Sequence, residues 1–80
     1  MPTVLRIGPY RFFFYSNEGN EPPHIHVRSA IGEAKFWLTT VELAYNYGYR
    51  GHELGQVKQL VTENRELLIE AWSEYADRKR

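Results

Sequence analysis

Three side chains in the segment 21–28 have the types and the spacing that catalysis needs. The segment reads Glu-Pro-Pro-His-Ile-His-Val-Arg, so His24, His26 and Arg28 occupy alternate positions. In an extended strand, alternate residues point to the same side. Imidazoles exchange protons near neutral pH and a guanidinium binds oxyanions, which suits acid–base work on a phosphodiester. We therefore name these three as the candidate catalytic residues.

The same imidazoles are the beginning of a metal site. Zinc needs at least a third protein ligand, for which only His52 and Glu33 are candidates, and only if the fold brings them near. The chain has no cysteine to supply a thiolate. Because two ligands do not make a site, we predict no metal and no cofactor.

The order His, apolar, His, apolar resembles the motif of the histidine triad nucleotide hydrolases. That motif continues to a third histidine, where this sequence has Arg28. The comparison depends on that residue, so the chemistry of those hydrolases is not transferred. The sequence also contains no nucleophile elbow around a serine and no glycine-rich phosphate loop.

Composition limits the fold and its setting. Eighty residues predict a single domain over 1–80, and an aromatic content of 15% supplies much buried area for so short a chain. The lack of cysteine, of a targeting segment and of a long apolar run predicts a soluble, cytoplasmic protein. Ten basic and ten acidic residues give no net charge, so any anion binding must come from local patterning.

The elements that must position the histidines are short strands followed by helix. Alternation of β-branched and aromatic residues predicts strands over 3–7, 10–15, 24–29, 33–38 and 41–45, the last being favoured over a helical turn. A loop is predicted over 16–23, which contains two prolines. From Gly51 the period becomes helical, with Leu54, Val57, Val61, Leu68, Trp72 and Tyr75 on one stripe. Asn64 interrupts this stripe and predicts a break.

The predicted strands have two different faces. The first is apolar and must meet the helical stripe; it carries Leu5, Ile7, Phe12, Phe14, Ile25, Val27, Ala34, Phe36, Leu38, Val41 and Leu43. The fold class is therefore α+β, an antiparallel sheet of four or five short strands packed on one or two C-terminal helices. The second face is expected toward solvent; it carries Arg6, Arg11, Phe13, Tyr15, His24, His26, Arg28, Glu33, Lys35 and Trp37.

Cations and rings on this second face support three interpretations. Single-stranded RNA platforms stack bases on rings and hold phosphates with Arg and Lys, and on this basis the candidate binding residues are Arg11, Tyr15, Lys35 and Trp37. An ordinary wet sheet face has a similar composition. Aromatic and arginine side chains also anchor protein interfaces, which would make the face a docking surface.

Several further motifs stand along the chain: Pro-Thr-Val at 2–4, Phe-Phe-Phe-Tyr at 12–15, the loop and strand over 16–27, Lys-Phe-Trp-Leu at 35–38, Glu-Asn-Arg-Glu-Leu-Leu at 63–68 and Glu-Ala-Trp at 70–72. Together they resemble one family of small bacterial proteins, a domain of unknown function termed DUF4160. The resemblance covers nearly the whole chain. One departure is Arg50, where relatives often have a serine before the helix.

The resemblance implies a two-gene module of the toxin–antitoxin type. The expected partner is a cognate small protein of the DUF2442 type or a second copy of the chain, with RNA as a target and no membrane. A toxin half would act on RNA through His24, His26 and Arg28. The alternative is a non-enzymatic module that holds its cognate partner on the same face. Whether the protein is an enzyme stays open at this point.

Overall fold

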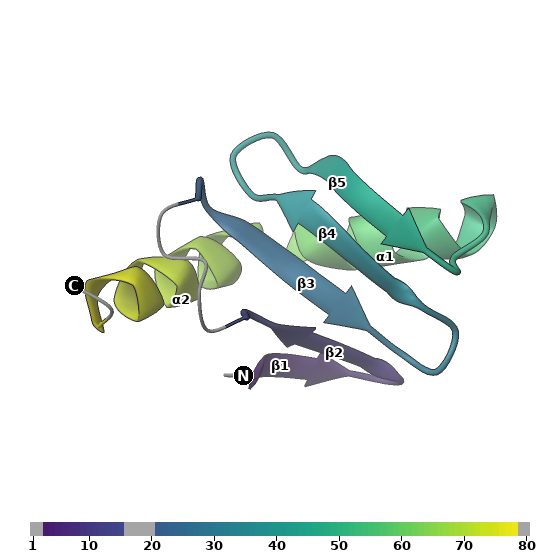
Figure 1. Cartoon of the computed structure of the whole chain (residues 1–80), viewed down its shortest axis with the longest axis horizontal. Helices are drawn as coiled ribbons and strands as arrows, with labels where there is room; N and C mark the ends of the chain where they lie inside the picture. The colour runs from purple at the N-terminus through teal and green to yellow at the C-terminus, as the bar shows by residue number, and fades with distance from the viewer. Residues whose placement is uncertain (1–2, 16–20, 79–80) are drawn as a thin grey trace.

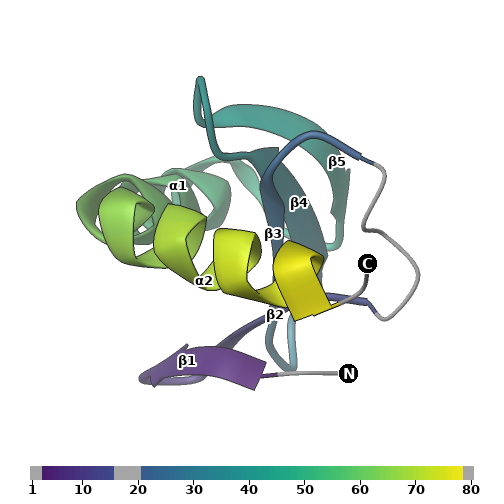
Figure 2. The same ribbon diagram turned by 90° about the vertical axis from the view of Figure 1, so that its left-hand side faces the viewer.

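The protein is described by a computed structural model over residues 3–15 and 21–78. In this part of the chain a five-stranded antiparallel sheet, in the order β1-β2-β3-β4-β5, precedes two helices (Figure 1). The elements are β1 (Thr3–Ile7), β2 (Tyr10–Phe13), β3 (His24–Arg28), β4 (Glu33–Trp37), β5 (Glu42–Tyr47), α1 (Gly51–Glu63) and α2 (Arg65–Arg78). Both helices lie on one face of the sheet (Figure 2). The predicted α+β architecture is confirmed.

The strand bounds differ slightly from the predicted ones. The first strand is as predicted, while β2 ends at Phe13 and the next two strands are one residue shorter. β5 begins at Glu42 because Val41 has a φ of 57°, which no strand residue adopts. The predicted loop lies partly outside the described residues, which leave out 16–20.

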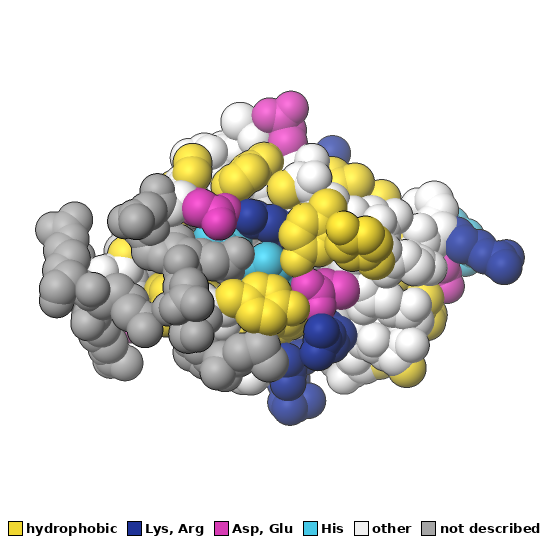
Figure 3. All heavy atoms as spheres, in the orientation of Figure 1, with side chains coloured by type: hydrophobic (Ala, Val, Ile, Leu, Met, Phe, Trp, Pro, Cys, Tyr) yellow, Lys and Arg dark blue, Asp and Glu magenta, His cyan; other side chains and the backbone are white. Residues whose placement is uncertain are grey.

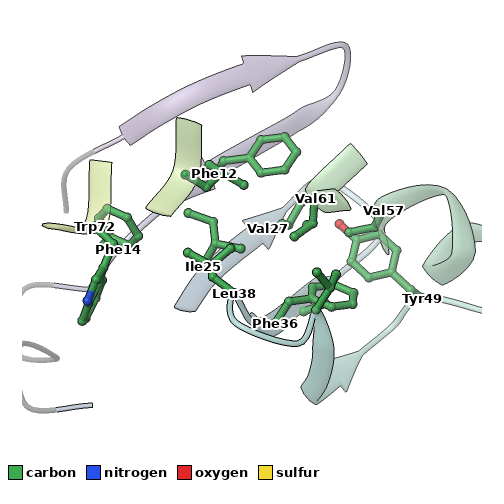
Figure 4. Close-up of a cluster of buried hydrophobic side chains, with 13 residues drawn as sticks. Phe12, Phe14, Ile25, Val27, Phe36, Leu38, Tyr49, Val57, Val61 and Trp72 are labelled. Carbon is green, nitrogen blue, oxygen red and sulfur yellow. The ribbon is translucent and has the colours of Figure 1, made fainter. Parts of the chain in front are cut away.

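The core lies between the sheet and the helices. Alternate residues of β2, β3 and β4 point to the same side, and there they meet the apolar stripe of the two helices (Figure 4). The buried members are Phe12, Phe14, Ile25, Val27, Ala34, Phe36, Leu38, Val41, Tyr49, Val57, Val61, Leu68 and Trp72. Burial of the helical residues confirms the predicted stripe. The core therefore fixes the opposite side of β3 as the side that carries the histidines.

The break between the helices is at Asn64, as predicted. Both its main-chain N–H and its Nδ2 donate to the carbonyl of Leu60, at 3.1 and 2.8 Å, which ends α1. At the start of α2, Arg65 donates from Nε to the carbonyl of Leu38 at 2.7 Å. This bond ties the second helix to the end of β4. Within the described ranges, neither helix is long and apolar enough to cross a membrane.

Leu43 does not lie in the core, so the prediction that it belongs to the apolar face packed on the helices was wrong. It is paired with Phe36 and shares that residue's side of the sheet, yet its side chain is 42% exposed. The register of β4 and β5 shifts between Lys35 and Phe36, and β5 is the last strand of the sheet. An edge strand with a bulge turns away from the layer that covers its neighbours.

Candidate functional site

The sheet face without helices carries a group of interacting polar side chains. We call it the polar cluster; its members are Tyr15, Glu21, His24, His26, Arg28, Glu33, Lys35 and Tyr45. Figure 3 shows histidine atoms near the middle of this face, with carboxylate and cationic side chains beside them and hydrophobic side chains around. Five of its members lie on β3 and β4, which are paired with each other inside the sheet.

Glu33 is the central acceptor of the polar cluster. Its carboxylate accepts from the hydroxyl of Tyr15 at 3.0 Å to each oxygen, and from the hydroxyl of Tyr45 at 2.7 Å. Arg28 donates to it from Nε at 3.0 Å and approaches it with Nη2 at 2.9 Å. Residues 28 and 33 are direct cross-strand partners, so the hairpin itself places this ion pair.

The environment of Glu33 favours its charged form. Burial alone would raise its pKa, but the hydrogen bonds from Tyr45 and Tyr15 and the charge and hydrogen bond of Arg28 together lower the pKa below the usual 4.5. A carboxylate held by so many donors is a weak base. Its most direct role is therefore to hold the surrounding side chains in place.

His26 is buried beneath other side chains of this face and is not exposed on its surface. Its Nδ1 is 2.9 Å from the hydroxyl of Tyr45 and 3.8 Å from the carboxylate of Glu33. The single hydrogen of that hydroxyl is donated to Glu33, so Nδ1 of His26 carries a hydrogen and donates it to Tyr45. The imidazole is stacked on Phe13, with ring centroids 5.4 Å apart. The histidine thereby orients the tyrosine.

His24 is buried at the other end of the strand. Its Nδ1 donates to the carbonyl of Pro22 at 2.9 Å, and Glu21 lies 4.0 Å away. Its ring centroid is 4.6 Å from that of Trp72 in α2. The prediction that both histidines face solvent was wrong, since His24 is 0% and His26 1% exposed. The predicted side of the sheet is right, but other side chains cover it.

Lys35 is also buried, contrary to its predicted position toward solvent. Its Nζ is 2.5 Å from the carboxylate of Glu21 and 4.7 Å from the ring centroid of Trp37. The lysine is thus a partner in an ion pair and covers an aromatic ring. Trp37 itself is half-buried.

The remaining predicted residues surround the polar cluster. Tyr15 is half-buried and faces His26 edge-on, with centroids 4.5 Å apart. Arg11 lies on Phe13, its guanidinium carbon 4.6 Å from the ring centroid. Phe13 was expected toward solvent but is fully buried. The structure thus brings all seven predicted site residues to one face and leaves mainly Arg28 accessible.

No part of the described chain gathers three or more His, Cys, Asp or Glu side chains in a metal-binding arrangement. Of the two extra ligands considered, Glu33 lies near His26 but is already occupied by three donors. His52 lies in α1, in the helical layer. The Nδ1 atoms of His24 and His26 take part in the hydrogen bonds described above.

Three residues of the polar cluster, Glu21, Glu33 and Tyr45, were missed as site residues by sequence reasoning. Glu33 was considered only as a metal ligand, and Tyr45 was assigned only to a strand. The short turn between Arg28 and Glu33 was a usable signal, because it makes them cross-strand partners. Tyr45 gave no such signal, since it is 19 residues from His26 and reaches it only through the order of the strands.

Tyr45→Phe is expected to lower the free energy of unfolding by about 1–3 kcal/mol, because it leaves the Nδ1–H of His26 without this acceptor. Glu33 would also lose its shortest donor. Urea unfolding followed by circular dichroism measures the change. Tyr47→Phe is the control, since its side chain is 69% exposed and its change should stay within about 0.5 kcal/mol. Equal effects of both changes would contradict the described bonds.

Comparison with known proteins agrees with the motifs of the sequence. The model of a domain of unknown function, DUF4160, matches residues 10–73 of the 80-residue chain. The matched range contains every member of the polar cluster and Trp72. No curated protein and no solved structure matches the chain. Because the match covers most of its length, the chain belongs to the DUF4160 family.

Proposed function

We propose that the protein acts on RNA through the helix-free face of its sheet, as one half of a toxin–antitoxin-like two-gene module. The observation that carries this proposal is the outer layer of that face. The side chain of Arg28 is 50% exposed, that of Tyr47 69%, and Arg6 is exposed too. Guanidinium groups hold phosphates, and exposed rings stack on bases. Because the net charge is zero, binding depends on this local pattern.

The polar cluster gives the outer layer its geometry. His26 donates to Tyr45, Tyr45 donates to Glu33, and Glu33 holds Arg28, so a chain of hydrogen bonds leads from the buried imidazole to the exposed cation. In this conformation His26 and His24 do not reach a substrate. We infer that their part is to position Arg28 and its neighbours, and that direct contact with RNA falls to the exposed residues.

Tyr47→Ala is expected to weaken binding of a short single-stranded RNA about 5- to 150-fold, the loss typical of one stacked base. Affinity is measured by fluorescence anisotropy at low salt. Leu67→Ala is the matched control, because Leu67 is 49% exposed but lies in α2. Binding that Tyr47→Ala leaves unchanged would contradict the RNA face, and a wild-type chain that binds no RNA would reject the RNA function.

A second candidate function, favoured by the sheet edge, is a non-enzymatic module that holds a cognate small partner protein of the DUF2442 type. β5 is an edge strand whose Leu43 is 42% and whose Tyr47 is 69% exposed. An edge strand offers free main-chain groups to an added strand, and exposed apolar side chains beside it add contact area. Co-expression with the cognate partner decides this candidate. A complex that survives Leu43→Asp would contradict it.

A further inference from the structure

Three arginines occupy directly paired positions on three neighbouring strands. Arg6 of β1 is paired with Arg11 of β2, and Arg11 is paired with Arg28 of β3. We call Arg6, Arg11 and Arg28 the arginine row. Like charges at paired positions destabilise a sheet. The arginine row therefore lowers the stability of the fold, and folding gives no reason for its presence. In Figure 3 cationic side chains gather on this part of the helix-free face.

The described residues do not neutralise the arginine row. Arg28 is paired with Glu33, but that carboxylate also accepts from Tyr15 and Tyr45. Among the described residues Arg11 has no carboxylate partner, and its Nε and Nη2 atoms are buried there with no hydrogen-bond partner. Most buried donors in proteins have a partner, and a buried donor without one costs free energy. Two such atoms on one guanidinium therefore indicate a missing acceptor.

Phe13 holds two of the guanidinium groups in place. The guanidinium carbon of Arg11 is 4.6 Å from the Phe13 ring centroid, and that of Arg28 is 5.8 Å from the same centroid. Phe13 is fully buried and is stacked in turn on His26. The two cations are therefore oriented before any ligand arrives, which lowers the entropic cost of binding.

We propose that the arginine row is a binding site for a phosphate-class oxyanion, seated between Arg11 and Arg28 with the exposed Arg6 beside it. A guanidinium presents paired donors that match two oxygens of a phosphate, and such charge-assisted bonds are strong. The oxyanion supplies the acceptor that Arg11 lacks and offsets the repulsion within the row. This inference rests on the proposed function where the phosphate belongs to RNA; a small phosphate ester has the same chemistry.

Titration of the wild-type protein with inorganic phosphate tests the site. At constant ionic strength, phosphate should shift the Nε–Hε resonance of Arg11 in nuclear magnetic resonance spectra, and chloride should not. Arg11→Gln should weaken phosphate binding at least about tenfold. It should leave the unliganded protein as stable as the wild type or more so, because it removes a buried unpaired charge. Arg50→Gln, at the start of α1, is the matched control and should bind as the wild type does.

The outcomes separate this site from the proposed function. Phosphate binding without RNA binding supports the oxyanion site with a small phosphate ester as ligand, and rejects the RNA function. RNA binding that Arg11→Gln leaves intact, together with no phosphate-dependent shift, overturns the oxyanion site alone. An equal response to acetate also overturns it. Tyr47→Ala should weaken RNA binding and leave phosphate binding unchanged, since Tyr47 lies outside the row.

Discussion

Gly32→Ala is expected to lower the free energy of unfolding by at least about 3 kcal/mol. Gly32 directly precedes β4, where the main chain passes close to the end of β5. A Cβ at this position would meet the backbone oxygen of Tyr47 and lie 3.0 Å from the Cα of Gly48. Main-chain atoms beside a paired strand cannot move aside as a flexible side chain can. The added methyl group must therefore separate β4 from β5 at this end.

Gly55→Ala is the matched control for this change. Gly55 lies in α1 and is exposed, and a Cβ there would have nothing within 4 Å. Alanine should raise the free energy of unfolding by about 0.5–1 kcal/mol, because glycine loses more main-chain entropy in a helix. Urea unfolding followed by circular dichroism measures both variants. If Gly32→Ala stayed within about 0.5 kcal/mol of the wild type, the close approach of the two main chains would be refuted.

The sequence was sufficient to predict which side of the sheet the residues of β1 to β4 take. Ile25 and Val27 alternate with His24 and His26, and a period of two allows only one division between the faces. The helix break was predictable for a similar local reason, since Asn64 interrupts an apolar stripe with a side chain that bonds to the main chain. Local patterns of this kind require no knowledge of distant contacts.

Burial of the histidines was not predictable in this way. Alternation assigns a side chain to a face but does not say what covers that face. His24 is covered in part by Trp72, which is 48 residues further along the chain, and His26 is bonded to Tyr45 of β5. Both contacts depend on the order of the strands and on the path of α2. The candidate site thus changed from exposed imidazoles to an exposed arginine layer supported by buried imidazoles.

Glu33→Gln is expected to lower the free energy of unfolding by about 2 kcal/mol at neutral pH. The amide keeps the shape of the side chain but loses the charge that Arg28, Tyr15 and Tyr45 stabilise, and hydrogen bonds to charged groups are worth about 1.5–3 kcal/mol. The side chain of Arg28 is half exposed, so solvent screens its contribution to this stabilisation. Glu70→Gln is the control, because Glu70 is exposed on α2 and its change should stay within about 0.5 kcal/mol.

The effect of Glu33→Gln should depend on pH with a definite sign. Hydrogen bonds and Arg28 lower the pKa of Glu33 below 4.5 in the folded protein, so its carboxylate stabilises the fold above pH 4.5. That contribution is lost as pH falls through the lowered pKa. The difference in stability between wild type and Glu33→Gln should therefore be constant well above pH 4.5 and shrink below it. Other carboxylates titrate in both proteins and cancel in the difference. A difference in stability that stays constant down to pH 2 would contradict a stabilising role of the Glu33 carboxylate.

Glu33→Gln also distinguishes two roles that Glu33 could have for the arginine row. One is to support the fold, and the other is to compete with the oxyanion for the donors of Arg28. If Glu33 only supports the fold, Glu33→Gln should weaken phosphate binding along with stability. If the carboxylate competes with the oxyanion for the donors of Arg28, its loss frees those donors and removes a repulsive charge. We expect the second result, tighter phosphate binding by a less stable protein, measured by titration where both proteins are folded. Weaker binding at neutral pH would place Glu33 within the site as a positioning residue and would contradict the competition.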